Sequence, residues 1–173
     1  MDGAGSVIRM MIARGASDEV DGVLSAMPVG FSQALTRVSR KLYDTDTVFQ
    51  PEEPGCVSLE EMINRLPTPI LLFVLKPEGG GSALLCFEPH LVNALVELSV
   101  GATRNCVLRD LRSPTLVDNA LCRLFAEGLA GALIEEVAKV SGNQVLKSLC
   151  ISHVEEQPGR LALSFRPGSY WGL

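Results

Sequence analysis

Residues 66–101 read LPTPILLFVLKPEGGGSALLCFEPHLVNALVELSVG and combine three kinds of local signal. The apolar run 69–75 is too short to cross a bilayer and fits a β-strand that is buried on both faces. The glycine-rich residues 78–82 are typical of a tight turn, and residues 83–87 are expected to return as a second strand. Pro89 predicts the start of a helix, because proline is tolerated in the first helical turn. We therefore expect a strand, a turn, a strand and a helix, with a glycine exit at Gly101.

The residues before this unit predict two helices and an N-terminal arm. Apolar residues recur at three- and four-residue intervals over 29–43, which predicts a helix. Ser58 is the expected cap of a short helix, with Glu61 completing a capping box. We expect the domain to span 28–173 and residues 1–27 to form a separate arm. An amphipathic helix is expected over residues 7–13 of that arm, either as a docking peptide or packed on the domain.

The residues after Gly101 predict the longest helix of the chain. Ser113 is its expected cap, with Pro114 at the first helical position. A wide apolar stripe follows it through Val137. Gly128 and Gly131 lower helix propensity, so their presence indicates a close approach by a neighbouring backbone.

The end of the chain predicts further strands. Residues 144–154 alternate loosely and are expected to form a strand, while residues 161–165 fit either a strand or a short helix. The chain stops at what looks like the start of another strand, so we expect the domain to lack its last strands. A long helix followed by a strand occurs at 31–50 and again at 115–154. This faint repeat predicts a domain with pseudo-two-fold symmetry.

Composition narrows the class of protein. The 173 residues are 47% hydrophobic and 20% charged, which is enough apolar material for a sizeable core. The net charge of −5 argues against nucleic acid as a partner, since that partner requires clustered basic residues. The five cysteines include no CxxC pair, and the two histidines lie near no cysteine pair, so a zinc site is not expected. The N-terminus lacks the layout of a secretory signal, and the odd number of cysteines suggests a reducing cytosol.

Few residues offer catalytic chemistry. Glu61 and Asn64 lie one helical turn apart and could orient a water for phosphate hydrolysis, but a capping box with a surface amide is the better explanation of the pair. The acids at 44 and 46 fit a solvated turn better than a metal site. Neither His90 nor His153 has the neighbours of a catalytic triad. Glycines 79–81 lack the Lys-Ser/Thr of a phosphate loop. We therefore predict no catalytic residues, no metal site and no cofactor.

Residues 31–139 resemble the middle domain of the flagellar motor switch protein FliM. That family has an "LP-P-LL" strand, an "LLxFxPxLVxALV" strand and helix, a glycine loop, and a long helix opened by a T/S-P-T-like cap. This chain has LPTP at 66–69, LLCFEPHLVNALV at 84–96, Gly101, and RSPT at 112–115. The resemblance covers about two-thirds of the chain, and FEPHLVNALV is its most specific piece.

The resemblance implies a fold and a role. The fold would be a CheC-like pseudo-two-fold α/β sandwich with a central sheet flanked by long helices. CheC-type phosphatases share it and carry a catalytic Glu and Asn in the two long helices, but the matching helices here, 31–43 and 115–139, have no Glu-x-x-Asn. The resemblance therefore implies a non-catalytic structural component of the flagellar motor switch, or C-ring. Its role would lie in torque transmission, chemotaxis and rotation switching.

The resemblance also implies partners. In the family a Gly-Gly-x-Gly loop contacts the rotor protein FliG, and its counterpart here is Gly101, Ala102, Thr103 and Arg104, in which only the first glycine is retained. Other implied partners are FliN, neighbouring copies of the chain in a ring, and phosphorylated CheY, although the family's acidic CheY-binding peptide is not recognisable in residues 7–15. We expect the chain to lack the C-terminal domain through which the family pairs with FliN. The implied location is cytoplasmic, at the inner face of the bacterial inner membrane.

Two other functions fit the same pattern. A CheC-like phosphatase of a phosphorylated response regulator would use Glu61 and Asn64. A ring component of a type III secretion system would share the fold, and its gene neighbourhood would distinguish it.

Overall fold

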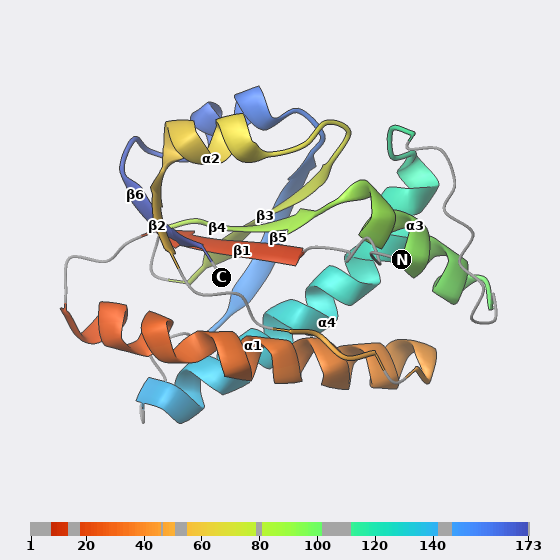
Figure 1. Ribbon diagram of the computed structural model, residues 1–173, viewed down its shortest axis with the longest axis horizontal. Coiled ribbons are helices and arrows are strands. Elements are labelled where there is room, and N and C mark those ends of the chain that lie inside the picture. The colour runs from red at the N-terminus through yellow and green to blue at the C-terminus, as the bar shows by residue number, and fades with distance from the viewer. Residues whose placement is uncertain are drawn as a thin grey trace.

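The computed structural model describes residues 8–13, 18–45, 47–50, 55–78, 81–101, 112–141 and 147–172. Its elements form three layers: two long helices and α3, then a six-stranded sheet, then two short helices (Figure 1). In chain order they are β1 (Ile8–Ala13), α1 (Asp18–Tyr43), β2 (Gly55–Ser58), α2 (Leu59–Arg65), β3 (Leu71–Pro77), β4 (Ala83–Phe87), α3 (Pro89–Ser99), α4 (Leu116–Ser141), β5 (Leu149–Glu155), the 3-10 helix η1 (Pro158–Leu163) and β6 (Ser169–Gly172).

The hairpin β3–β4 forms the centre of the core, as the sequence predicted. Alternate residues of each strand face opposite layers. Phe73, Leu85 and Phe87 belong to the cluster under the long helices, whereas Val74 and Cys86 belong to the cluster under α2 and η1. Every residue from 70 to 75 is fully buried. An unbroken apolar run is therefore required here, because both faces of the sheet are covered.

The sheet has an internal two-fold symmetry. Its strand order is β2-β6-β1-β4-β3-β5, and each neighbouring pair is antiparallel. Exchanging β1, β2 and β3 with β4, β5 and β6 gives the same order read backwards. The long helices α1 and α4 correspond under this exchange, as do α2 and η1. The predicted pseudo-two-fold α/β architecture is confirmed.

The two long helices cross at a pair of equivalent glycines. Helices α1 and α4 each have 26 residues, so equivalent positions differ by 98 in number (116 minus 18). Gly30 and Gly128 correspond in this way. A Cβ at Gly30 would lie 3.0 Å from Oε2 of Glu136, and one at Gly128 would lie 3.0 Å from Cγ1 of Val38. Residues 38 and 136 also correspond, so the symmetry extends to individual contacts.

The prediction of a helix over residues 7–13 is wrong. Residues 8–13 form β1, which lies between β6 and β4 and pairs Ile8 with Phe87. Seven mostly apolar residues fit a buried strand as well as a helix, and pairing with β4 decides between them. Helix α1 begins at Asp18 and continues through Pro28, so the boundary expected at 27 falls inside a helix.

Other sequence expectations have mixed outcomes. Residues 47–50 form no strand, contrary to a strand expected after the first long helix. Of residues 161–165, the first three belong to the 3-10 helix η1. Gly128 lies close to the neighbouring helix, but a Cβ there would meet side chains rather than the predicted backbone, and a Cβ at Gly131 would meet nothing within 4 Å. Among the helices of the described residues, none is long and apolar enough to cross a membrane.

Candidate functional site

Gly101, the first residue of the predicted rotor-binding loop, ends helix α3. Its φ of +79° is a left-handed conformation that glycine adopts without strain, and its N–H donates to the carbonyl of Leu98 at 3.1 Å. The residue is exposed, and a Cβ placed on it would meet nothing within 4 Å. The preceding Val100 is 72% exposed. The helix therefore ends in an exposed glycine turn.

The other three predicted residues of this loop, Ala102, Thr103 and Arg104, lie outside the described residues. Their assignment stays a prediction.

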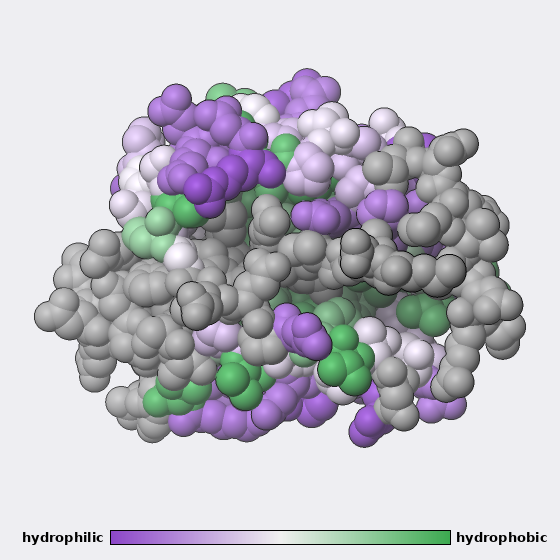
Figure 2. All heavy atoms as spheres, in the orientation of Figure 1, coloured by the Kyte–Doolittle hydropathy of each residue, from purple (hydrophilic) through white to green (hydrophobic). Residues whose placement is uncertain are grey.

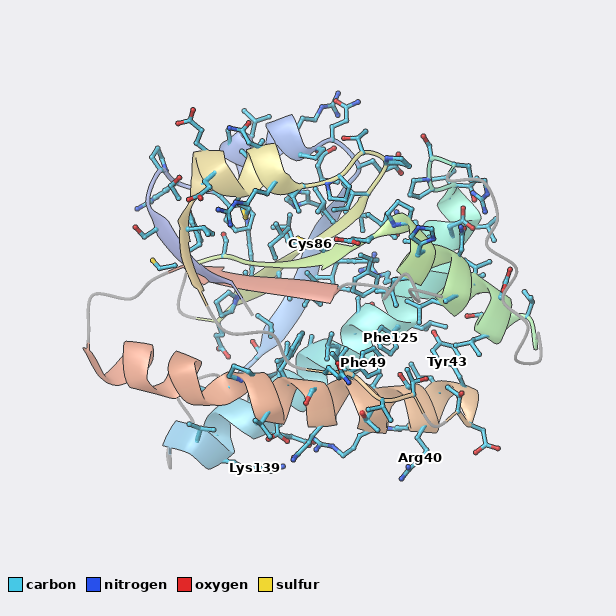
Figure 3. The ribbon with its side chains drawn as sticks, in the orientation of Figure 1. Arg40, Tyr43, Phe49, Cys86, Phe125 and Lys139 are labelled. Carbon is cyan, nitrogen blue, oxygen red and sulfur yellow. The ribbon has the colours of Figure 1, made fainter. Side chains whose placement is uncertain are left out.

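The end of helix α1 packs against the end of α3. The Tyr43 ring stacks on Phe125 of α4, with 6.1 Å between the ring centroids, and Figure 3 shows both residues at this end of the helix layer. Burial raises the pKa of Tyr43, and the nearby Ser99 hydroxyl opposes that rise. The Ser99 hydroxyl donates to the Leu95 carbonyl at 2.7 Å, and the Tyr43 hydroxyl has no hydrogen-bond partner of good geometry. The last residues of α1 and α3 thus meet beside Phe125 of α4, two residues before Gly101.

The start of α4 is held by a capping box and an arginine. The Thr115 N–H and hydroxyl both donate to Asp118 Oδ2, at 2.7 and 2.8 Å, and the Asp118 N–H donates to Thr115 Oγ1 at 3.3 Å. Arg112 binds both carboxylate oxygens of Asp118. The Arg112 hydrogen bond, with those from Thr115, holds the pKa of Asp118 well below its ordinary value despite burial.

This geometry corrects the predicted start of the helix. Thr115 rather than Ser113 caps α4, and Pro114 precedes the helix instead of opening it. The carboxylate at Asp118, three residues after Thr115, is the signal that distinguishes the two candidates.

The residues considered for phosphatase chemistry lie on α2, in the layer opposite the long helices. Glu61 and Asn64 are both exposed. The Glu61 carboxylate forms an ion pair with Arg65, and the Glu61 N–H donates to Ser58 Oγ at 3.1 Å. Ser58 is therefore the cap of α2, as predicted. Glu61 is engaged in stabilising that short helix.

The histidines offer no activated nucleophile. Nε2 of His153 lies 3.1 Å from Ser164 Oγ, and Nδ1 lies 3.3 Å from Ser152 Oγ, so a serine rather than a carboxylate faces each ring nitrogen. The Ser164 N–H donates to the Leu161 carbonyl at 2.9 Å. These contacts of His153 thus differ from a Ser–His–Asp arrangement, in which a carboxylate orients the imidazole.

Metal-binding side chains are also dispersed. No group of three His, Cys, Asp or Glu residues within the described ranges could hold a metal ion. Asp44 is exposed, and residue 46 lies outside the described part of the chain.

Sequence reasoning missed an exposed apolar strip on α4. Leu116, Val117 and Leu124 are 86%, 65% and 57% exposed, and Ala120 between them is also exposed. The sequence interpretation included these residues in one wide apolar stripe, without separating an exposed part from a buried one. Cys122 and Phe125 of the same helix are fully buried, so the first half of α4 is apolar on both sides. A stripe wider than one helix face was the available signal.

Comparison with solved structures identifies the fold. The chain matches a chain of a FliG–FliM complex from H. pylori with a TM-score of 0.66 and 13% identity, covering 91% of this chain and 93% of that one. It matches the FliM middle domain from Vibrio alginolyticus with a TM-score of 0.65 and 14% identity, covering 89% and 91%. A chain of a FliM–SpeE complex from H. pylori gives 0.62 and 16%, covering 83% and 72%.

Neither a family model nor a curated protein matches the sequence. The structural likeness shows that the chain has the fold of the FliM middle domain. A fold is shared by proteins of different function, so the likeness alone assigns no function to this chain.

Proposed function

We propose that this chain is a non-catalytic structural component of the flagellar motor switch, and that it binds the rotor protein FliG through the exit of α3. The observation that carries the proposal is the likeness to the FliM middle domain over 89% of this chain. One of the matched structures is a complex of FliG with FliM. Gly101 supplies the exposed left-handed turn at the position where the family's glycine loop begins.

The proposal includes a place and further partners. The chain would lie at the cytoplasmic face of the inner membrane, in a ring of copies that contact each other through their long helices. FliN and phosphorylated CheY would be its other partners, and torque transmission, chemotaxis and rotation switching its roles. The rotor contact would use Ala102, Thr103 and Arg104 as well as Gly101. The helices that match the catalytic ones of CheC-type phosphatases, 31–43 and 115–139, carry no Glu-x-x-Asn, which favours a scaffold over such an enzyme.

The test is binding of purified FliG to the full chain, with Gly101→Val as the variant. A β-branched residue at φ +79° costs about 1–2 kcal/mol, so the turn must reshape. We expect a loss of affinity of about tenfold or more, which corresponds to about 1.4 kcal/mol.

The matched control is Gly81→Val, in the hairpin between β3 and β4. Gly81 has a φ of +91°, so the substitution imposes a similar backbone strain away from α3. We expect it to lower stability while leaving FliG affinity unchanged. Absence of FliG binding by the unaltered chain would reject the proposal, and equal losses in the two variants would reject the assignment of the site.

A further inference from the structure

The Tyr43 hydroxyl, at the end of α1, is the one buried side-chain nitrogen or oxygen of the described residues without a hydrogen-bond partner of good geometry. Figure 2 shows hydrophilic residues along the edge of the molecule that α1 forms. Tyr43 departs from that pattern, because its ring stacks on Phe125 within the helix layer. Burying a donor without a partner costs stability, and a phenylalanine would fill the same space without that cost. The hydroxyl therefore requires an explanation beyond packing.

An acceptor for this hydroxyl lies close by, on the last residue of α3. The Ser99 hydroxyl is near enough to Tyr43 to affect the pKa of the phenol. Its single hydrogen donates to the Leu95 carbonyl at 2.7 Å, while the lone pairs of its oxygen can still accept. The thiol of Cys122 is a second polar group near Tyr43, but sulfur is a weak acceptor. A small shift of the end of α3 would therefore give the Tyr43 hydroxyl a partner.

The last turn of α3 is able to make such a shift. The buried residues of the helix lie within its first seven positions, namely Pro89, Leu91, Val92 and Leu95. Residues 96–99 are half-buried, and Val100 and Gly101 beyond them are exposed. Segments with few buried apolar contacts move at the lowest free-energy cost. Ser99 and the two residues that follow it can therefore move together while the start of the helix stays packed.

We propose that Tyr43 is a positioning residue for the exit of α3, and that its hydroxyl donates to Ser99 when FliG is bound at Val100 and Gly101. The inference rests on the proposed binding of FliG. A partner shifts a conformational equilibrium only through interactions that differ between the two conformations. The Tyr43–Ser99 hydrogen bond is such an interaction, because the hydroxyl is unpaired in the free chain and paired in the bound one.

The test compares the stability of the full chain with its affinity for purified FliG in the variant Tyr43→Phe. Removing the hydroxyl relieves the buried donor of the free chain, so the melting temperature should rise by about 2–4 °C. The same change removes a hydrogen bond of the bound state, so the affinity for FliG should fall by about threefold to tenfold. A side chain with only a packing role would not change stability and affinity in opposite directions.

A second variant, Ser99→Ala, removes the acceptor and leaves the Tyr43 hydroxyl in place. It should lower the affinity for FliG by the same factor as Tyr43→Phe. The double variant should lose no more affinity than either single variant, because both changes remove the same hydrogen bond. Additive losses would show that the two hydroxyls act separately and would overturn the inference.

Tyr170→Phe is the matched control. Tyr170 is buried in the opposite layer, and its hydroxyl donates to the Arg166 carbonyl. This variant should lower the melting temperature and leave the affinity for FliG unchanged. An unchanged affinity in Tyr43→Phe, or a lower melting temperature of that variant, would overturn the inference alone. Absence of FliG binding by the unaltered chain would reject the proposed function, and this inference with it.

Discussion

The α1–α4 crossing contains two equivalent contacts, and in each of them a glycine faces a side chain of the other helix. The facing side chain is apolar in one contact and charged in the other. At one end Gly128 accommodates Val38, and at the other Gly30 accommodates Glu136. Val38 is buried among apolar residues. Glu136 is buried too, but it accepts hydrogen bonds from Arg37 of α1 and from Lys139 of α4, the latter at 2.7 Å. Figure 3 shows Lys139 on α4 at the end opposite Tyr43.

The difference between Val38 and Glu136 distinguishes a feature that both contacts share, the glycine, from one that varies, the polarity of the facing side chain. A Cβ at either position would lie 3.0 Å from the facing side chain, so the close approach of the helices favours a glycine at both, most strongly at Gly128, where the facing atom belongs to the branched Val38. The facing residue is free to be apolar or charged, provided that a buried charge has partners. Burial raises the pKa of Glu136, but the hydrogen bonds from Lys139 and Arg37 outweigh it, and the pKa is lowered overall.

The largest effect is expected from making the apolar end charged. Val38→Glu would bury a carboxylate at the position equivalent to Glu136. Arg37 pairs with Glu136, but the residue equivalent to Arg37 is Glu135, which has the same charge as the new carboxylate. Only Lys41, the counterpart of Lys139, could compensate. We expect a loss of about 3 kcal/mol, as for a buried charge without its partners. Chemical denaturation would measure it. A loss similar to that of Val38→Ala would show that a glutamate at position 38 reaches water freely.

The glycine requirement is tested by Gly128→Ala against Gly131→Ala. Both changes gain about 0.8–1 kcal/mol of helix propensity. At position 131 nothing opposes this gain, so the variant should be more stable than the unaltered chain. At position 128 the new Cβ presses on Val38, a β-branched residue with little freedom to move, and overpacking costs about 1–3 kcal/mol.

We therefore expect Gly128→Ala to be less stable than Gly131→Ala by about 1–3 kcal/mol. Thermal unfolding of the two variants would measure the difference. Equal stabilities would mean that the two helices separate at no cost.

The smallest effect is expected from making the charged end apolar. Glu136→Val reproduces the residue found at the equivalent position, and it leaves Arg37 and Lys139 with half-exposed side chains that remain hydrated. Buried ion pairs are often replaced by apolar residues at little cost. We expect a change within about 1 kcal/mol at neutral pH. A large loss would show that the ion pairs stabilise the crossing beyond filling it.

The same variant has a defined pH signature. Because the folded state lowers the pKa of Glu136, its contribution is present above the ordinary value of 4.5 and is lost as the pH falls through the lower folded value. The stability of the unaltered chain should therefore fall more steeply below about pH 4.5 than that of Glu136→Val. Parallel curves would contradict the assignment of this carboxylate.

The sequence predicted an element of secondary structure correctly where its local signal had only one interpretation. The run 69–75, the glycine turn and Pro89 each admit one structure, and β3, β4 and α3 were placed correctly. Residues 8–13 admit two, and only the pairing with β4 selects the strand. Helix propensity gave the same prediction of a close neighbour for Gly128 and for Gly131, but only Gly128 has one. The direction in which each residue points from the helix axis decides which of them faces α1, and propensity does not contain that direction. The exposed strip on α4 was missed for a related reason. The apolar residues of a helix show that part of its surface is buried, but not which of them the rest of the fold covers.

The palindromic strand order has a consequence for how the chain could be connected. The hairpin between β3 and β4 corresponds to a junction between β6 and β1, which are antiparallel neighbours that pair Met11 with Gly172. A circular permutant that joins β6 to β1 through a short linker and opens the chain at Gly81 would exchange the order of the two halves. Every strand would keep the neighbours that it has in the sheet. The topology thus permits either half to come first in the chain. The two halves still differ in their contacts at the helix crossing, where Gly30 faces Glu136 and Gly128 faces Val38.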